Sequence, residues 1–158
     1  MQNISAIVYT SNTGFTRRYA EMLAGKTGLP ACDLAGGAVP GRGTSVLYLG
    51  WLCAGGVKGL KKARGRFHVK AVCAVGLAPD SNGKVLEEQD LPAFYLRGGY
   101  APERLTGIYK LMMKPMASMI AKAPAEDEHQ REMKEAMVHG GDFVSEEQLA
   151  PVLAWIQG

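Results

Sequence analysis

An apolar segment of strand length runs directly into a hydroxyl-rich turn and then into a helical pattern at the start of the chain. The apolar segment is Ile4–Thr10, the turn Ser11–Thr16 reads SNTGFT, and the helical pattern covers Phe15–Gly25. A helix that begins at the end of a buried strand leaves backbone N–H groups without partners, and its dipole adds partial positive charge there. The order of these segments therefore predicts an anion-binding loop that fits a phosphate group.

The side chains of this turn are suited to binding a phosphate. Hydroxyls at Ser11, Thr13 and Thr16 can donate hydrogen bonds, and Gly14 lets a ligand approach the backbone closely. A second interpretation stays open, in which Ser11 or Thr13 only caps the helix and the other hydroxyls are solvated. The turn lacks the lysine of a Walker loop and has one glycine where a dinucleotide fingerprint has three, so ATP and NAD are disfavoured as ligands.

Strand-like and helical patterns alternate along most of the chain. The strand-like segments are Ile4–Thr10, Leu29–Leu34, Ser45–Gly50, Val69–Leu77 and Ala93–Arg97. The helical patterns are Phe15–Gly25, Val57–Arg66, Leu105–Lys122, Glu126–His139 and Ser145–Ile156, the last of which opens with a capping-box arrangement, Ser145–Gln148. Several strand-like segments are almost continuously apolar, which is typical of parallel strands covered on both faces. Together they predict an α/β fold with a doubly wound, five-stranded parallel sheet in one domain, residues 1–158.

Cysteine usage and the lack of long apolar runs indicate a cytoplasmic protein. No run of about 18 apolar residues and no signal-peptide pattern is present. Cys32, Cys53 and Cys73 are widely spaced, with no C-x-x-C pair and no Cys/His grouping. We therefore expect reduced thiols and no metal site.

Positive and negative charges are concentrated in different halves of the chain. Residues 1–75 carry 10 Lys/Arg and 2 Asp/Glu, whereas residues 76–158 carry 8 and 13. Much of the basic excess lies in the helical pattern Val57–Arg66. Because no aromatic residues are interleaved with these charges, we expect a solvated helix face and no nucleic-acid partner.

The segments that follow the other predicted strands have the composition of ligand-binding loops. In a doubly wound sheet, ligands lie beyond the carboxyl ends of the strands, where the strand order reverses. Trp51–Gly59 combines a flat aromatic ring with several glycines, and further loops follow at residues 78–83 and 98–102. A phosphate loop beside an aromatic ring suits a phosphorylated flat ring, and FMN is the natural candidate. The alternative for Trp51 is an ordinary tryptophan at a strand end.

In the FMN hypothesis, the phosphate meets the first loop, and the isoalloxazine ring stacks on Trp51 and bonds to the backbone of Leu52–Gly56. Peptide groups of Gly55 or Gly56 would meet flavin N5, and the Cys53 thiol lies nearby in the sequence. The candidate FMN-binding residues are Ser11, Asn12, Thr13, Gly14, Phe15, Thr16, Trp51, Leu52, Cys53, Ala54, Gly55, Gly56, Ala78, Pro79, Gly98 and Tyr100.

The first turn resembles the phosphate loop of the flavodoxin family, T/S-x-T-G-x-T, and Ser11–Thr16 matches every defined position. The resemblance implies a flavodoxin-like sheet of order 2-1-3-4-5, with FMN at the junction of strands one and three. It also implies that Ser11, Thr13 and Thr16 bind the phosphate and that Trp51 is the inner stacking ring.

Two features depart from ordinary flavodoxins. Those proteins are usually strongly acidic, whereas this chain has a net charge of +3 and a pI near 8.8. The loop at residues 78–83 also lacks the aromatic that covers the outer flavin face in many members. Two roles stay open for Tyr100: it replaces that aromatic, or it packs locally.

A second stretch, FYLRGGY at residues 94–100 followed by LTGIYKLMMK at residues 105–114, resembles the flavodoxin-domain group that includes menaquinone-dependent protoporphyrinogen oxidases. In that group a long insert follows the fifth strand. Here the stretch up to Asp142 is far longer than the usual connection of about 2–6 residues. We therefore expect a helical insert at about residues 101–142.

The insert is rich in methionine, and two interpretations of its apolar surface stay open. One is a docking face for a quinone, a porphyrin, a membrane or a partner protein. The other, which we favour, is packing against the domain's own core or against a second subunit of a homodimer. The residues concerned are Ile108, Leu111, Met112, Met113, Met116, Met119 and Ile120, with Lys110, Lys114 and Lys122 to reach anionic groups.

Arg97, at the end of the fifth predicted strand, has two plausible roles. It could hold the flavin's carbonyl edge or an acidic substrate, or it could form a salt bridge to Asp80 or Glu103. The three histidines, His68, His129 and His139, lack partners in the sequence, and we expect no catalytic or metal role for them.

The leading hypothesis from the sequence is an FMN-binding redox protein that passes electrons between the flavin and a partner protein or a quinone. A flavoenzyme resembling protoporphyrinogen oxidase is an alternative within that class. An alternative of another class is a regulatory or binding module that keeps the fold and binds no flavin.

Overall fold

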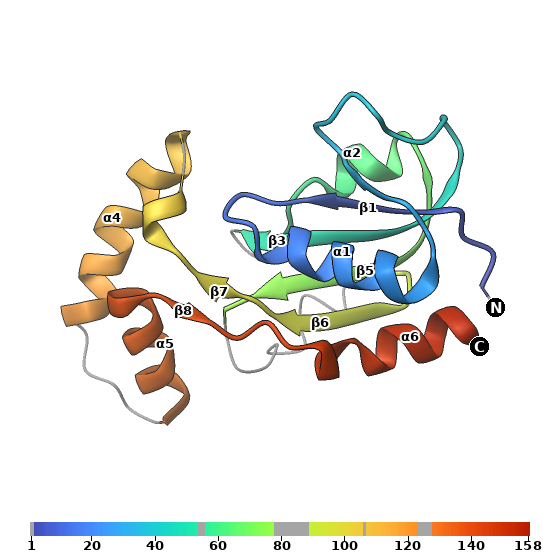
Figure 1. The fold of residues 1–158 in the computed structure, drawn as a ribbon. Coiled ribbons are helices and arrows are strands. Elements are labelled where there is room, and N and C mark those ends of the chain that lie inside the picture. Colours follow the sequence, from blue (N-terminus) through green and yellow to red (C-terminus); the bar gives the residue numbers. More distant parts are fainter. Residues whose placement is uncertain (1, 54–55, 78–88, 106, 123–127) are drawn as a thin grey trace.

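The computed structural model describes residues 2–53, 56–77, 89–105, 107–122 and 128–158. Figure 1 shows an α/β structure built around a mostly parallel sheet. The strands of this sheet are β1 (Ala6–Thr10), β2 (Ala31–Asp33), β3 (Ser45–Cys53), β4 (Gly56–Val57), β5 (His68–Gly76) and β6 (Ala93–Arg97). The helices are α1 (Phe15–Thr27), α2 (Leu60–Arg64), α4 (Gly107–Lys122), α5 (Glu128–His139) and α6 (Ala150–Gln157).

Five of the strands form a parallel path in the order β2-β1-β3-β5-β6. The sixth, β4, lies off this path and pairs with β3 in the antiparallel direction, with Leu52 opposite Val57 and Cys53 opposite Gly56. The predicted α/β class with a parallel central sheet is confirmed. The predicted count of five strands is wrong, because the described part of the chain forms a sheet of six, and the predicted order 2-1-3-4-5 contains no counterpart of β4.

The additional strand arises because the chain does not leave the sheet after Gly50, where the apolar pattern predicts the end of a strand. Instead β3 continues to Cys53, and the chain returns as β4. Gly59 then takes a left-handed conformation, at φ 80°, and caps a short α2, so the predicted helix Val57–Arg66 loses its first turn. The predicted loop Trp51–Gly59 is therefore largely a β-hairpin.

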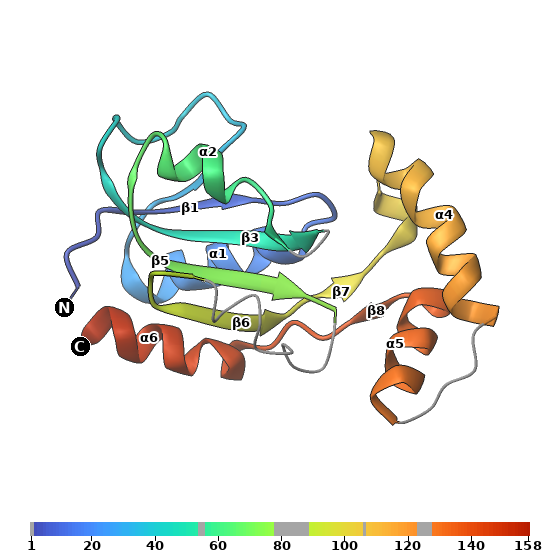
Figure 2. The same ribbon diagram turned by 180° about the vertical axis from the view of Figure 1, so that it is seen from behind.

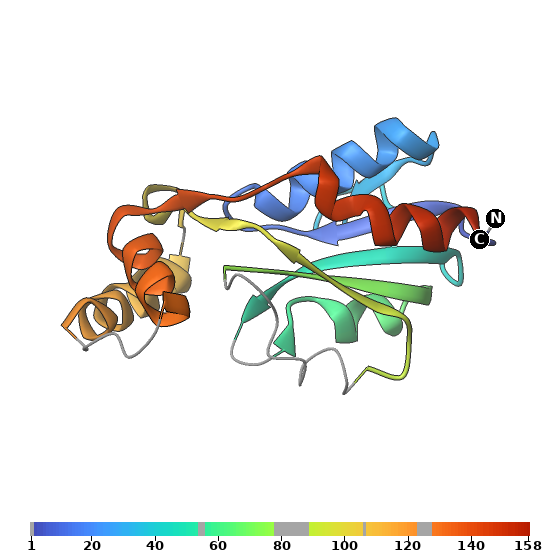
Figure 3. The same cartoon turned by 90° about the horizontal axis from the view of Figure 1, so that it is seen from below.

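Helices cover both faces of the sheet. Figure 3 shows α1 and α6 on one face and α2 on the other. Tyr19 and Leu23 of α1 and Ile156 of α6 are buried in the first core cluster, and Leu60 and Ala63 of α2 are buried in the second. Strands between two helical layers must be apolar on both sides, which explains their nearly continuous hydrophobic sequences.

A two-stranded ribbon carries a pair of helices beyond the carboxyl edge of the sheet (Figures 1 and 2). The ribbon pairs β7 (Gly99–Tyr100) with β8 (Gly141–Asp142), and a 3-10 turn, η1 (Pro102–Arg104), precedes α4. The helices α4 and α5 pack against each other, and α5 also contacts β7. Residues 101–142, expected as a helical insert, thus contain η1, α4, α5 and β8. None of the described helices is long and apolar enough to cross a bilayer.

The last helical segment begins with a 3-10 turn, η2 (Glu146–Leu149), and continues as α6. Ser145 Oγ accepts a hydrogen bond at 3.2 Å from the backbone N–H two residues further on. Gln148 does not complete the predicted capping box. Its amide oxygen accepts from Arg97 N at 2.6 Å, and its amide nitrogen donates to Phe143 O at 2.8 Å. Gln148 thereby joins the end of β6 to the segment that follows β8.

Candidate functional site

The loop that follows β1 lies where the direction of the strand connections reverses. The chain passes from β1 to β2 on one side and then crosses to β3 on the other side of β1. In open α/β sheets, ligands bind beyond the carboxyl ends of the strands at such a switch point. The loop at residues 11–14, which the sequence predicts to bind a phosphate and which we call the phosphate loop, therefore occupies the position at which this architecture binds ligands.

Hydrogen bonding within the phosphate loop leaves the N-terminus of α1 uncapped. Gly14 is the N-cap residue, in a left-handed conformation at φ 101°, and no side chain caps the helix. Gly14 N instead donates to Ser11 Oγ at 3.1 Å, which closes the loop on itself. The alternative in which Ser11 or Thr13 caps α1 is therefore not borne out, and the first amides of α1 lack a side-chain acceptor.

The first turn of α1 contains no acidic residue and is followed by positive charge. Arg17 pairs with Glu21 at 2.8 Å, and Arg18 pairs with Asp142 of β8 at 2.7 Å. Partial burial raises the pKa of Asp142, but the hydrogen bonds from Arg18 and from Val144 N outweigh it and hold the pKa below its usual value. A negative charge near a helix N-terminus is stabilising, and a bound anion would supply that charge at this end of α1.

Asn12 holds a buried polar atom without a hydrogen-bond partner. Among the residues that the structure describes, Asn12 Oδ1 is the one buried side-chain nitrogen or oxygen atom that has no hydrogen-bond partner. An unpaired buried acceptor costs about 1–3 kcal/mol, so native structures seldom keep one that nothing satisfies. Because this atom lies in the phosphate loop, a hydroxyl or N–H group of a ligand is a fitting partner.

Phe15 and Thr16, which follow the loop, are held inside the protein, with exposed fractions of 6% and 2%. A Cβ on Gly99 would come within 2.8 Å of the Phe15 ring, and a Cβ on Gly98 within 3.3 Å of Phe15 Cβ. These two glycines therefore let the start of α1 pack closely against the end of the sheet. The candidate residue Gly98 thus lies directly against the residue that follows the loop.

The β3–β4 hairpin leaves the sheet at the same edge as the phosphate loop. Thr10 pairs with Gly50, so Ser11 and Trp51 are the next residues of their neighbouring strands. The structure thereby brings together two of the segments predicted to bind FMN. In the hairpin Trp51, Leu52 and Cys53 are partly buried and Gly56 is exposed, whereas the candidates Ala54, Gly55, Ala78 and Pro79 lie outside the described residues.

A buried tyrosine, which the apolar pattern marks only as part of a strand, ties this hairpin to the end of β1. Tyr48 Oη lies 2.7 Å from Thr10 Oγ1 and 2.6 Å from the Lys58 carbonyl oxygen. Burial raises the pKa of Tyr48 to about 12. A Cβ on Gly59 would collide with this hydroxyl, so glycine is required there. The signal available in the sequence was a tyrosine inside an aliphatic strand, because a buried tyrosine hydroxyl needs a partner.

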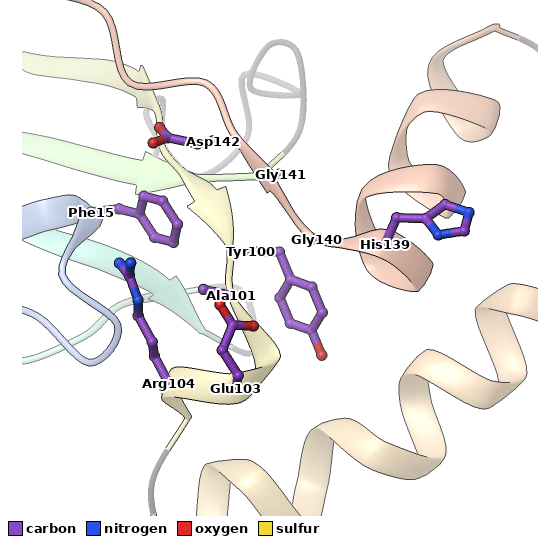
Figure 4. A pocket seen from close by; sticks show the side chains of 9 residues that line it. All are labelled: Phe15, Tyr100, Ala101, Glu103, Arg104, His139, Gly140, Gly141 and Asp142. Carbon is purple, nitrogen blue, oxygen red and sulfur yellow. The ribbon is translucent and has the colours of Figure 1, made fainter.

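A cavity of about 180 Å³ opens between the start of α1 and the base of the insert (Figure 4). Phe15, Tyr100, Arg104 and His139 are among its lining residues. The Arg104 guanidinium lies 3.5 Å from the Thr13 carbonyl oxygen, which brings a cation beside the phosphate loop. Pockets for drug-sized ligands start at about 300 Å³, so this cavity has room for a small polar group and not for a flavin ring.

Arg97 connects the sheet to the insert. Its Nε donates to the carbonyl oxygen just after β5 at 3.1 Å, and its guanidinium lies 3.6 Å from the centre of the Phe143 ring. Its Nη2 pairs with Glu132 of α5 at 3.4 Å. A salt bridge is one of the two roles left open for Arg97, and Arg97 does form one, but its partner is Glu132 and not Glu103. The other suggested partner, Asp80, lies outside the described residues.

The thiols are free, as the spacing predicted. Cys73 is fully buried in β5, and burial raises the pKa of its thiol, so it acts as core packing. Cys32 and Cys53 are partly buried. The described part of the chain contains no group of His, Cys, Asp or Glu side chains that could hold a metal ion.

The apolar side chains of α4 that the structure describes are exposed. Ile108 is 64% exposed, Leu111 and Met119 are each 72% exposed, and Met112 is 45% exposed. Packing against the domain's own core, one of the two forms of the favoured interpretation, is therefore wrong for these four residues, whereas packing against a second subunit stays a prediction. The side chains of Met113, Met116 and Ile120 lie outside what is described.

Comparison with models of known protein families found no match to this chain. Comparison with curated proteins also found no match. At the site itself, an uncapped helix N-terminus, an unpaired buried acceptor and an aromatic hairpin share one edge of the sheet.

Proposed function

We propose that this chain is a flavodoxin-like protein that binds FMN and transfers electrons between the flavin and a partner protein or a quinone. The observation that carries the proposal is the phosphate loop, uncapped and at the switch point of a parallel sheet. Flavin bound there would supply one- and two-electron redox chemistry.

The phosphate of FMN would bind at the first turn of α1. The amides there have no side-chain acceptor, and no acidic residue competes for them. Arg104 adds a cation beside the Thr13 carbonyl. A dianionic phosphate would be stabilised both by hydrogen bonds from the first amides of α1 and by the positive charge of Arg104.

The unpaired acceptor of Asn12 favours a ligand that carries hydrogen-bond donors as well as a phosphate. Asn12 Oδ1 is buried in the loop without a partner. The ribityl chain of FMN has hydroxyl groups next to its phosphate, so one of them can donate to this oxygen. An inorganic anion without donors, such as sulfate, would leave the oxygen unpaired.

The isoalloxazine ring would lie against Trp51 on the β3–β4 hairpin. Trp51 is partly exposed and directly follows the residue paired with the end of β1. Tyr48 holds the hairpin in place through Thr10 and Lys58. A planar side chain on an anchored hairpin gives a stacking surface that needs little reorganisation on binding.

The test is a titration of the purified chain with FMN and with riboflavin, followed by flavin fluorescence. We expect FMN to bind at least about tenfold more tightly than riboflavin, which corresponds to about 1.4 kcal/mol from the phosphate. Asn12→Ala should weaken FMN binding without lowering the stability of the flavin-free protein, because it removes an acceptor that is unpaired there.

Trp51→Leu should weaken FMN binding and riboflavin binding alike, whereas Trp155→Leu on α6 is the matched control and should leave both unchanged. A colourless protein that takes up no FMN would contradict the proposal and favour the flavin-free module. Reoxidation of the reduced protein by a quinone, compared with a one-electron carrier protein, would identify the class of partner.

A further inference from the structure

The exposed apolar side chains of α4 that the structure describes fall in one stripe along the helix. Ile108, Leu111, Met112 and Met119 are separated by three, one and seven residues, a spacing that keeps all four within one face of a helix. At 1.5 Å per residue, the stripe is roughly 16 Å long. Single exposed hydrophobic residues need no explanation, but a contiguous patch marks an interaction surface.

The stripe lies on a helix pair that stands beyond the carboxyl edge of the sheet. α4 packs on α5, α5 contacts β7, and Figures 1 and 2 show both helices on the far side of the β7–β8 ribbon from the sheet. The four side chains are solvent-exposed there, so a partner surface can contact them. The described lining of the cavity in Figure 4 contains none of the four stripe residues, so they are not a wall of that pocket.

The charge of α4 indicates what surface it meets. The helix carries Lys110, Lys114 and Lys122 and no acidic residue, and the Lys110 and Lys122 side chains are exposed. An amphipathic helix with an apolar face and lysines is typical of helices that lie in the interface of an anionic bilayer. Two copies meeting through this stripe would instead bring like charges together.

We propose that α4 docks this protein on an anionic phospholipid surface, with the stripe in the acyl boundary and the lysines at the headgroups. The helix then lies in the plane of the membrane. One helix stripe is also far smaller than the roughly 20–30 residues that each partner contributes to a standard protein interface. This inference does not depend on flavin binding.

The test is flotation of the full-length protein, as purified, with vesicles of phosphatidylcholine and phosphatidylglycerol, compared with vesicles of phosphatidylcholine alone. We expect the protein to float with the anionic vesicles and to be released as salt is raised. Leu111→Gln combined with Met119→Gln should weaken partitioning by about tenfold or more, because both side chains lose their transfer into lipid. Ala154→Gln, at an exposed position of α6, is the matched control and should bind as the parent does.

A charge variant separates the two contributions. Lys110→Gln combined with Lys122→Gln should reduce binding to the anionic vesicles and flatten its salt dependence. The proposal is overturned if the protein stays with neither kind of vesicle, if it binds both kinds equally, or if the Leu111/Met119 variant binds as the parent does. A mass twice that of the 16.9 kDa chain, lost in that variant and without vesicle binding, would assign the stripe to a second copy.

Discussion

The phosphate loop and the α4 helix both lie beyond the carboxyl edge of the sheet, but they are held in different ways. The loop continues into buried Phe15 and Thr16 and stands beside a hairpin anchored by Tyr48. α4 packs on α5 and exposes Leu111 and Met119 to solvent, each at 72%.

The difference shows how one fold can combine a rigid site with an adaptable surface. A site that must position a ligand needs side chains locked by packing and hydrogen bonds. A surface that meets a fluid partner needs apolar area and flexible side chains, and methionine supplies both. We therefore expect substitutions in the packing that supports the loop to cost much more stability than substitutions in or around the insert.

The largest effect is expected from Gly59→Ala. Gly59 has φ 80°, and a Cβ there would lie 2.6 Å from Thr10 Oγ1 and collide with the Tyr48 hydroxyl. We expect the free energy of unfolding in urea to fall by about 3 kcal/mol, together with loss of FMN binding. The control is Gly25→Ala in α1, where a Cβ meets no atom within 4 Å and should be neutral or stabilising by up to about 1 kcal/mol. Equal effects of the two substitutions would contradict the anchoring role of Tyr48.

A smaller effect is expected from the ionisation of Tyr48 at high pH. Burial raises its pKa in the folded protein to about 12, from an ordinary value of 10.0, so its contribution to stability is complete below pH 10 and is lost as pH rises towards 12. Between these values the unfolding free energy should fall with pH by up to about 1.4 kcal/mol per unit more steeply in the parent than in Tyr48→Phe. The measurement is urea unfolding at a series of pH values, and parallel pH profiles would show that Tyr48 is not held neutral by burial.

The smallest effect is expected where the insert meets the sheet. Glu132→Gln removes the ion pair with Arg97, whose side chain is 17% exposed against 46% for Glu132. Partial exposure limits the expected loss of unfolding free energy to about 0.5–1 kcal/mol, but amide hydrogen exchange in β8 and at the base of the insert should become faster. Glu128→Gln, which breaks only the pair with Arg131 inside α5, should leave the exchange of β8 and the base of the insert unchanged. If the two variants exchange alike, Arg97 does not hold the insert.

Much of the central fold could be predicted because its signals are local. The apolar run before Ser11 and the helical spacing after it lie within one short stretch, and the structure places β1 and α1 there. The end of β3 could not be predicted in the same way. Leu52 joins the sheet because it pairs with Val57, a contact that the apolar pattern does not mark.

Part of the site was also hidden from the sequence. Tyr48 lies 38 residues from Thr10, and Arg97 lies 35 residues from Glu132, so neither pairing leaves a local pattern. The lack of a cap on α1 and the unpaired Asn12 oxygen are also properties of packed geometry. FMN binding itself stays a prediction.

The sequence by itself determined that a buried strand gives way to a polar loop and a helix, since hydrophobic periodicity and turn chemistry act between neighbouring residues. Only the tertiary structure decided that the Trp51 hairpin stands beside that loop and that the apolar face of α4 remains uncovered. Both depend on which distant segments pack together, because an apolar stripe has the same spacing whether a core covers it or solvent does.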